Sequence, residues 1–294
     1  MRKYIYITLL ASVLIGCGGN ESTEVVDEHI LETVVGTQET LERVEKSQMI
    51  FRTIPSPLET ATLFQEAGVE YNQSITSPIG NVSNYVTSVQ KSLNLGVYGA
   101  DLSFANIFGQ SQESMLYMNC SKILSDGLGV INAFDVATIE RMEVNMNNRD
   151  SLLGLISDAY WITDAHLKEN GQDHLSVLII TGGWIEGLYI GTATLNKDEP
   201  NKALMQRIAD QKYSLKSLID LLDTYDNESV AEIGDKLKTL QTVYSKIGVK
   251  TGETTVSERE GVATIGGGNV LTFETEIIFE IRAAIKKIRD EIIL

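Results

Sequence analysis

The chain has 294 residues, of which 43% are apolar and 22% charged, with 40 acidic side chains against 24 basic ones. This apolar share is sufficient for a sizeable core. The formal net charge of −16 repels phosphate backbones and anionic lipid headgroups. We therefore expect no nucleic-acid partner and no electrostatic attachment to a membrane surface.

The first 17 residues have the layout of a secretory signal peptide. Arg2 and Lys3 precede an apolar run over residues 4–15, which is followed by Gly16 and Cys17. A bilayer span needs about 20 apolar residues, so the run is too short for a transmembrane anchor. A cysteine is also an unusual residue at the cleavage site of an ordinary signal peptide, which is the other alternative.

The sequence Leu14-Ile15-Gly16-Cys17 resembles the lipobox of bacterial lipoproteins. The resemblance implies that residues 1–16 are a signal peptide and that Cys17 becomes the first residue. It further implies a diacylglycerol on the Cys17 thiol and a fatty acid, typically palmitate, on its amino group. More than one acyl chain is what stable membrane attachment requires.

Removal of the signal peptide would take away Arg2 and Lys3 but no acidic residue, which changes the net charge from −16 to −18. The lipid on Cys17, and not basic residues, would then hold the chain on a membrane. Because Gly18 and not Asp follows the cysteine, the pattern that resembles inner-membrane retention is missing. We expect an exported protein on the outer membrane, and the sequence leaves open which leaflet and which side.

Residues 17–52 form the predicted connection between anchor and domain. Residues 18–24 are small and polar, which is typical of a flexible tether. Apolar residues recur at helical spacing over 25–48, which predicts an amphipathic helix. This stalk helix either packs on its own domain or pairs with a partner helix.

From residue 53 onward, nearly every segment has the period of an α-helix, and we predict one all-α domain over 53–294, a bundle of about ten helices. Only residues 248–256 suggest an extended strand, and residues 257–271, with three consecutive glycines, are predicted to be a loop. Helices are expected over 56–68, 78–95, 97–108, 111–126, 136–147, 150–170, 173–195, from 199 onward, 214–223, 229–247 and 272–293.

The helix over 173–195 is the most apolar one, and Glu186 is the one charge between Leu175 and Leu195. Its glycines Gly183, Gly187 and Gly191 recur every four residues and would form a groove for a closely packed neighbour. A transmembrane helix is the alternative, but the glycines, the threonines and the carboxylate disfavour insertion. We predict a buried core helix.

Asp101 and Glu186 are acidic residues in otherwise apolar helices. A buried carboxylate has to be paired, hydrogen-bonded or protonated. If the two helices adjoin, Tyr98, Asp101, Trp184 and Glu186 would line a polar pocket that binds a ligand. The alternative is a satisfied polar network in the core.

Other chemical motifs are weak. Lipidation of Cys17 would leave Cys120 without a disulfide partner, and its spacing from Leu116, Ile123 and Leu124 predicts a buried hydrophobic residue. The histidines lack the spacing of metal ligands, and no phosphate-binding loop or nucleophile elbow occurs. We therefore predict no cofactor, no metal and no assigned catalytic residue.

Three segments, 54–61, 93–102 and 182–186, resemble those of a group of uncharacterised helical lipoproteins from Gram-negative bacteria. The resemblance implies class and location only. The leading functional hypothesis is a non-enzymatic envelope lipoprotein that binds a protein partner or a small ligand. A hydrolase that uses paired carboxylates and a purely structural scaffold are the alternatives.

Overall fold

The computed structural model describes residues 69–251, 255–259, 262–266 and 269–294, and over 251–269 it describes the backbone alone. The lipobox with Cys17, the tether and stalk over 17–52, and the expected helix over 56–68 lie outside the described residues. The predictions made for those segments therefore stay predictions.

The all-α, multi-helix fold class predicted from the sequence is confirmed. Two short 3-10 helices come first, followed by the α-helices. Their bounds are η2 (Gln73–Ile75), η3 (Ile79–Asn84), α3 (Ser88–Ile107), α4 (Ser111–Gly127), α5 (Val136–Val144), α6 (Arg149–Glu169), α7 (Asp173–Ala193), α8 (Lys202–Leu222), α9 (Glu228–Tyr244) and α10 (Thr275–Ile293).

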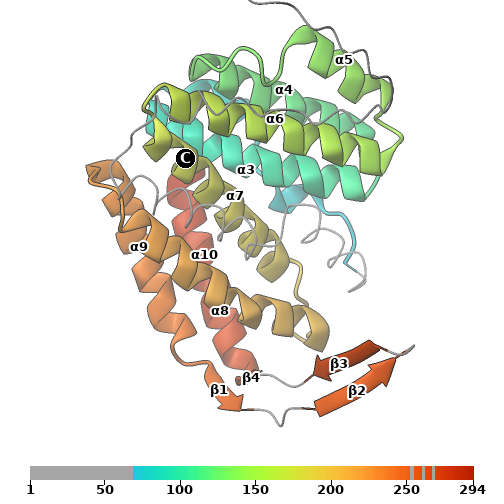
Figure 1. The fold of residues 1–294 in the computed structure, drawn as a ribbon, viewed down its shortest axis with the longest axis vertical. Helices are drawn as coiled ribbons and strands as arrows, with labels where there is room; N and C mark the ends of the chain where they lie inside the picture. The colour runs from blue at the N-terminus through green and yellow to red at the C-terminus, as the bar shows by residue number, and fades with distance from the viewer. Residues whose placement is uncertain (1–68, 252–254, 260–261, 267–268) are drawn as a thin grey trace, which may run out of the picture.

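Helix α7 connects the two halves of the bundle (Figure 1). On one side it packs against α3 and α6, and on the other against α8 and α10. Helix α4 covers α3, α5 covers α6, and α9 lies against α8 and α10. Although α7 is long and apolar enough to cross a membrane, 83% of its most apolar window is buried inside the protein. This burial agrees with the predicted core helix.

The backbones of α3 and α7 are in direct contact. A Cβ atom on Gly96 would lie 2.0 Å from the carbonyl oxygen of Ile179, and one on Gly182 would lie 1.9 Å from that of Leu93. Any larger residue would push the helices apart. The sequence predicted a glycine groove on α7 that includes Gly183, and the closest described contact is made by its neighbour Gly182.

The helices predicted over 78–95 and 97–108 are wrong in their bounds. The first part is the 3-10 helix η3, and α3 begins at Ser88 after a capping box made by Thr87 and Gln90. The helix then continues through Gly96 to Ile107. Gly96 does not end the helix because its missing side chain is used for packing against α7.

Asparagine caps explain most of the other differences in helix bounds. Asn148 accepts a hydrogen bond from the Ser151 amide and begins α6, whereas Asp150 or Ser151 was expected to do so. Asn201 and Asn227 begin α8 and α9 in the same way. The two helices predicted around 199–223 form one continuous α8.

The predicted loop over 257–271 is also wrong. Strands β1 (Gly248–Thr251) and β4 (Asn269–Thr272) pair antiparallel, as do β2 (Thr255–Arg259) and β3 (Val262–Gly266). These two separate two-stranded sheets, which we call the ribbon, lie next to the ends of α8, α9 and α10 (Figure 1). Leu271 is buried, whereas its neighbour Val270 is exposed, which is the two-residue alternation of a strand. A search for helical periods does not detect this pattern.

Candidate functional site

The four predicted ligand-binding residues lie on two helices that adjoin, as the hypothesis required. Tyr98 and Asp101 belong to α3, and Trp184 and Glu186 belong to α7. Asp101 and Glu186 meet in the interior, and neither has any exposed surface. Trp184 points elsewhere, and its indole Nε1 donates a 3.2 Å hydrogen bond to Gln211 on α8.

Glu186 is paired with Arg289 of α10. Arg289 donates from Nε to Oε2 at 2.8 Å and from Nη2 to Oε1 at 2.9 Å, so the pair is bidentate. The guanidinium carbon lies 4.3 Å from the centre of the Tyr189 ring. The ion pair therefore ties α7 to α10 at the centre of the bundle.

Asp101 is held differently. Its Oδ2 accepts a 3.0 Å hydrogen bond from the Ser77 amide. Its Oδ1 is buried and has no hydrogen-bond partner in the structure. Because Asp101 and Glu186 interact directly, a proton on one of the two carboxyls would let them share a hydrogen bond. Satisfaction of this buried oxygen thus depends on a proton between the two carboxyls.

Burial raises the pKa of Asp101 well above its ordinary value, and repulsion from Glu186 adds to this increase. Burial also raises the pKa of Glu186, but the charge and hydrogen bonds of Arg289 oppose that increase. Arg289 stays charged because Glu186 stabilises its cation despite the cost of burial. Of the two carboxyls, Asp101 is therefore the one whose surroundings favour the protonated form more, because Arg289 is bound to Glu186.

The segment over residues 73–78, which we call the strap, closes over this cluster. Arg289 donates from Nη2 to the Ser77 hydroxyl at 2.9 Å and to the Ile75 carbonyl at 3.3 Å. Tyr117 donates to the Thr76 hydroxyl at 2.6 Å, and Tyr98 donates to the Pro78 carbonyl at 2.9 Å. Side chains from three helices thus hold the strap.

Sequence reasoning missed Arg289 and Ser77. A signal for Arg289 was present, because it lies on the buried stripe of α10, four residues after Ile285 and four before Ile293. A charged residue in such a stripe indicates a buried partner. Ser77 carried no comparable signal, because its role comes from its main-chain amide as much as from its side chain.

The carboxylates do not line an open cleft. Asp101 and Glu186 have 0% exposure, Arg289 has 5%, and each is in contact with another member of the cluster or with the strap. Within the described part of the chain, no group of three or more metal-ligating side chains is found. The two residues on which a paired-carboxylate hydrolase would rest are out of reach of a substrate.

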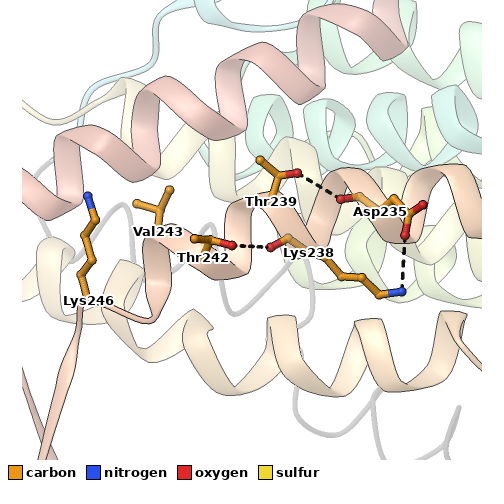
Figure 2. Close-up of a pocket in the computed structure, with 6 residues that line it drawn as sticks. All are labelled: Asp235, Lys238, Thr239, Thr242, Val243 and Lys246. Carbon is orange, nitrogen blue, oxygen red and sulfur yellow. Dashed lines mark hydrogen bonds and ion pairs between the residues drawn. The ribbon is translucent and has the colours of Figure 1, made fainter.

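A groove on the outside is a second candidate site, which the sequence did not predict. It has a volume of about 590 Å³, and all of its described lining residues belong to α9 or its end: Asp235, Lys238, Thr239, Thr242, Val243 and Lys246. Figure 2 shows them along one side of the helix, with Lys238 near Asp235. The groove is open to solvent and does not enclose a ligand.

Both lysines at this groove already have acidic partners. Lys238 lies 2.9 Å from Asp223 and 3.4 Å from Asp235. Lys246 pairs with Glu280 of α10. Their charges are thus largely used within the protein, which leaves little affinity for a small anion.

Comparisons of the chain with protein families, with curated proteins and with solved structures gave no match. Function therefore has to be argued from the residues of this chain alone.

Proposed function

We propose that this chain is an exported lipoprotein, acylated on Cys17 and anchored in the outer membrane, whose helical domain binds a partner protein and does not catalyse a reaction. The sequence Leu14-Ile15-Gly16-Cys17 supports the anchor, and Gly18 favours the outer membrane. The interior and the surface of the domain support the choice of a protein partner.

The buried carboxylates of the described bundle are closed off from a substrate. Asp101, Glu186 and Arg289 are buried and bind one another and the strap. The described groove on α9 is open and lined by a single helix, unlike the concave sites that enclose small ligands. These features weigh against both the hydrolase and the small-ligand alternatives.

The exposed apolar side chains of α4 are the observation that supports a protein partner. Met115, Leu116 and Ile123 are 43%, 43% and 44% exposed. Leu116 and Ile123 are seven residues apart and therefore lie on the same face of the helix. Ile131, which follows α4, and Val136 and Val144 on α5 are exposed as well. A concentration of large apolar residues on a surface is typical of an interaction site.

The anchor is tested by growing cells with an alkyne-labelled fatty acid. The wild-type chain is expected to incorporate the label and to sediment with outer membranes, whereas Cys17→Ala should lose both properties. Cys120→Ala is the matched control and should keep the label. Label that persists in Cys17→Ala would contradict acylation at this residue.

The partner surface is tested by photo-crosslinking in intact cells. A photoreactive residue at Met115 or Ile123 is expected to give one adduct of defined mass. The same residue at Ser157, exposed on α6, is the control and should give none. The adduct formed from Met115 should disappear when Leu116 and Ile123 are replaced by Ser. If Ser157 gives the same adduct as Met115 and Ile123, or if none of the three positions gives an adduct, a partner at α4 is refuted.

A further inference from the structure

The buried cluster contains two carboxyls but a single cation. Glu186 and Arg289 neutralise each other through two hydrogen bonds. Asp101 lies beside this pair, fully buried, and among the described residues no other Lys or Arg contacts it. A negative charge on Asp101 would therefore have to share Arg289 with Glu186, in a place where water cannot reach it.

The neutral form of Asp101 satisfies the geometry. One oxygen accepts a hydrogen bond from the Ser77 amide, and a proton on the unpaired Oδ1 would let that oxygen donate to Glu186, which the ionised form cannot do. Asp101 then connects α7 to the strap from its position on α3. Ionisation would remove the bond to Glu186 and set two negative charges side by side.

We propose that Asp101 is a proton-controlled latch for the strap over residues 73–78. While it is protonated, it holds Glu186 on one side and the Ser77 amide on the other. When it loses the proton, repulsion from Glu186 moves the Asp101 carboxylate away from the Ser77 amide, and the strap loses this contact while Tyr98, Tyr117 and Arg289 still hold it.

Titratable groups from the surrounding elements interact electrostatically with Asp101. These are Tyr98 on α3, Tyr117 and Cys120 on α4, Tyr160 on α6, Glu186 on α7, Arg289 on α10, and Tyr71 before the strap. Glu186 favours the protonated form of Asp101, whereas the charge of Arg289 opposes it. Burial raises the pKa values of Tyr98 and Tyr117, so both stay neutral. Arg289 is the single cation of this set, and it is bound to Glu186.

The sign of the pH dependence follows from the raised pKa of Asp101. An unfolded aspartate releases its proton near pH 4, whereas the folded protein retains the proton at higher pH. Between the two pKa values folding takes up a proton, so the folded state becomes less stable as the pH rises. For one proton, the unfolding equilibrium constant increases up to about tenfold per pH unit.

The test uses the full chain in a mild neutral detergent and follows urea unfolding between pH 5 and pH 8. Asp101→Asn removes the ionisable group but keeps a side chain that donates to Glu186. The wild type is expected to lose stability, relative to this variant, by up to about tenfold in the unfolding constant per pH unit. Asp164→Asn is the control, because Asp164 binds Lys168 and Ser176 away from the cluster, and it should follow the wild type.

Hydrogen exchange, measured on a peptide fragment that contains the strap, reports directly whether the Ser77 amide has lost its bond to Asp101. After correction for intrinsic rates, the Ser77 amide should exchange faster at pH 8 than at pH 6 in the wild type but not in Asp101→Asn. Equal pH dependence of the two proteins, in either measurement, would overturn the latch. Infrared spectroscopy of the wild type at pH 6 gives a test that needs no variant. A missing band of a buried protonated carboxyl would also overturn it.

Discussion

The direct contact between α3 and α7 gives the sharpest test of the fold. Gly96→Ala adds one methyl group, and that methyl would lie 2.0 Å from the Ile179 carbonyl oxygen and 2.6 Å from the Gly183 amide nitrogen. Ordinary van der Waals contact begins near 3.4 Å. Since both neighbours are backbone atoms of a buried helix, neither can rotate away, and the two helices have to separate.

The expected loss of stability follows from two opposing effects. Overpacking a core costs about 1–3 kcal/mol. Because the added methyl meets backbone atoms of α7, which cannot move as a side chain can, we expect a cost at the upper end of this range or above it. Alanine recovers about 1 kcal/mol because it has a higher helix propensity than glycine. We therefore expect Gly96→Ala to lower the free energy of unfolding by about 2 kcal/mol or more.

Gly154→Ala on α6 is the matched control, because a Cβ atom there would meet nothing within 4 Å. Helix propensity alone should then raise the stability of this variant by about 0.5–1 kcal/mol. Urea unfolding followed by circular dichroism measures both variants. If Gly96→Ala is as stable as the wild type, the close packing of α3 on α7 is refuted.

Three further predictions test the buried cluster, the thiols and a helix cap. Arg289→Leu should lower the free energy of unfolding by about 3–5 kcal/mol because it leaves Glu186 buried without a partner; Glu186→Leu combined with Arg289→Leu should recover part of that loss, and no recovery would contradict the pairing. Burial raises the pKa of Cys120 to about 11, so at pH 8 its thiol is almost wholly protonated. A thiol reagent should therefore find no fast-reacting group in the native mature protein and one after denaturation, whereas two would contradict acylation of Cys17. Asn227→Ala should cost about 1 kcal/mol in urea unfolding, because the amide of Val230 loses its cap; a loss below about 0.3 kcal/mol would argue against this cap.

The helices could be predicted from sequence because most of them have a buried stripe. On α6, Leu152, Ile156 and Leu167 repeat at helical spacing and are buried. The prediction that Cys120 is a buried residue is confirmed, although of the apolar residues at helical spacing from it Leu124 is buried while Leu116 and Ile123 are partly exposed. Periodicity locates a helix reliably, but it does not determine which side of an evenly apolar helix meets the core.

The strap could not be predicted because long-range contacts define it, and of the ribbon only the extended stretch over 248–256 was predicted. The strap is short and is held by Tyr98, Tyr117 and Arg289, which lie far from it in the chain. Pairing of β3 with β2 depends on register between segments that have no strong strand pattern of their own. Convergence of Asp101 and Glu186 was anticipated, but the cation that accompanies them was not.

The buried ion pair is better explained by the position of the strap than by stability. A bidentate pair in the interior gains little over apolar residues of similar size, because both charges must lose their water. Arg289, however, uses its remaining donor on Ser77 and Ile75, and apolar residues would not provide that contact. The charges therefore fix the position of the strap on the bundle. Since Asp101, Glu186 and Arg289 are bound by one another and by the strap, residues that recognise another molecule should be sought on the outer surface, beginning with α4.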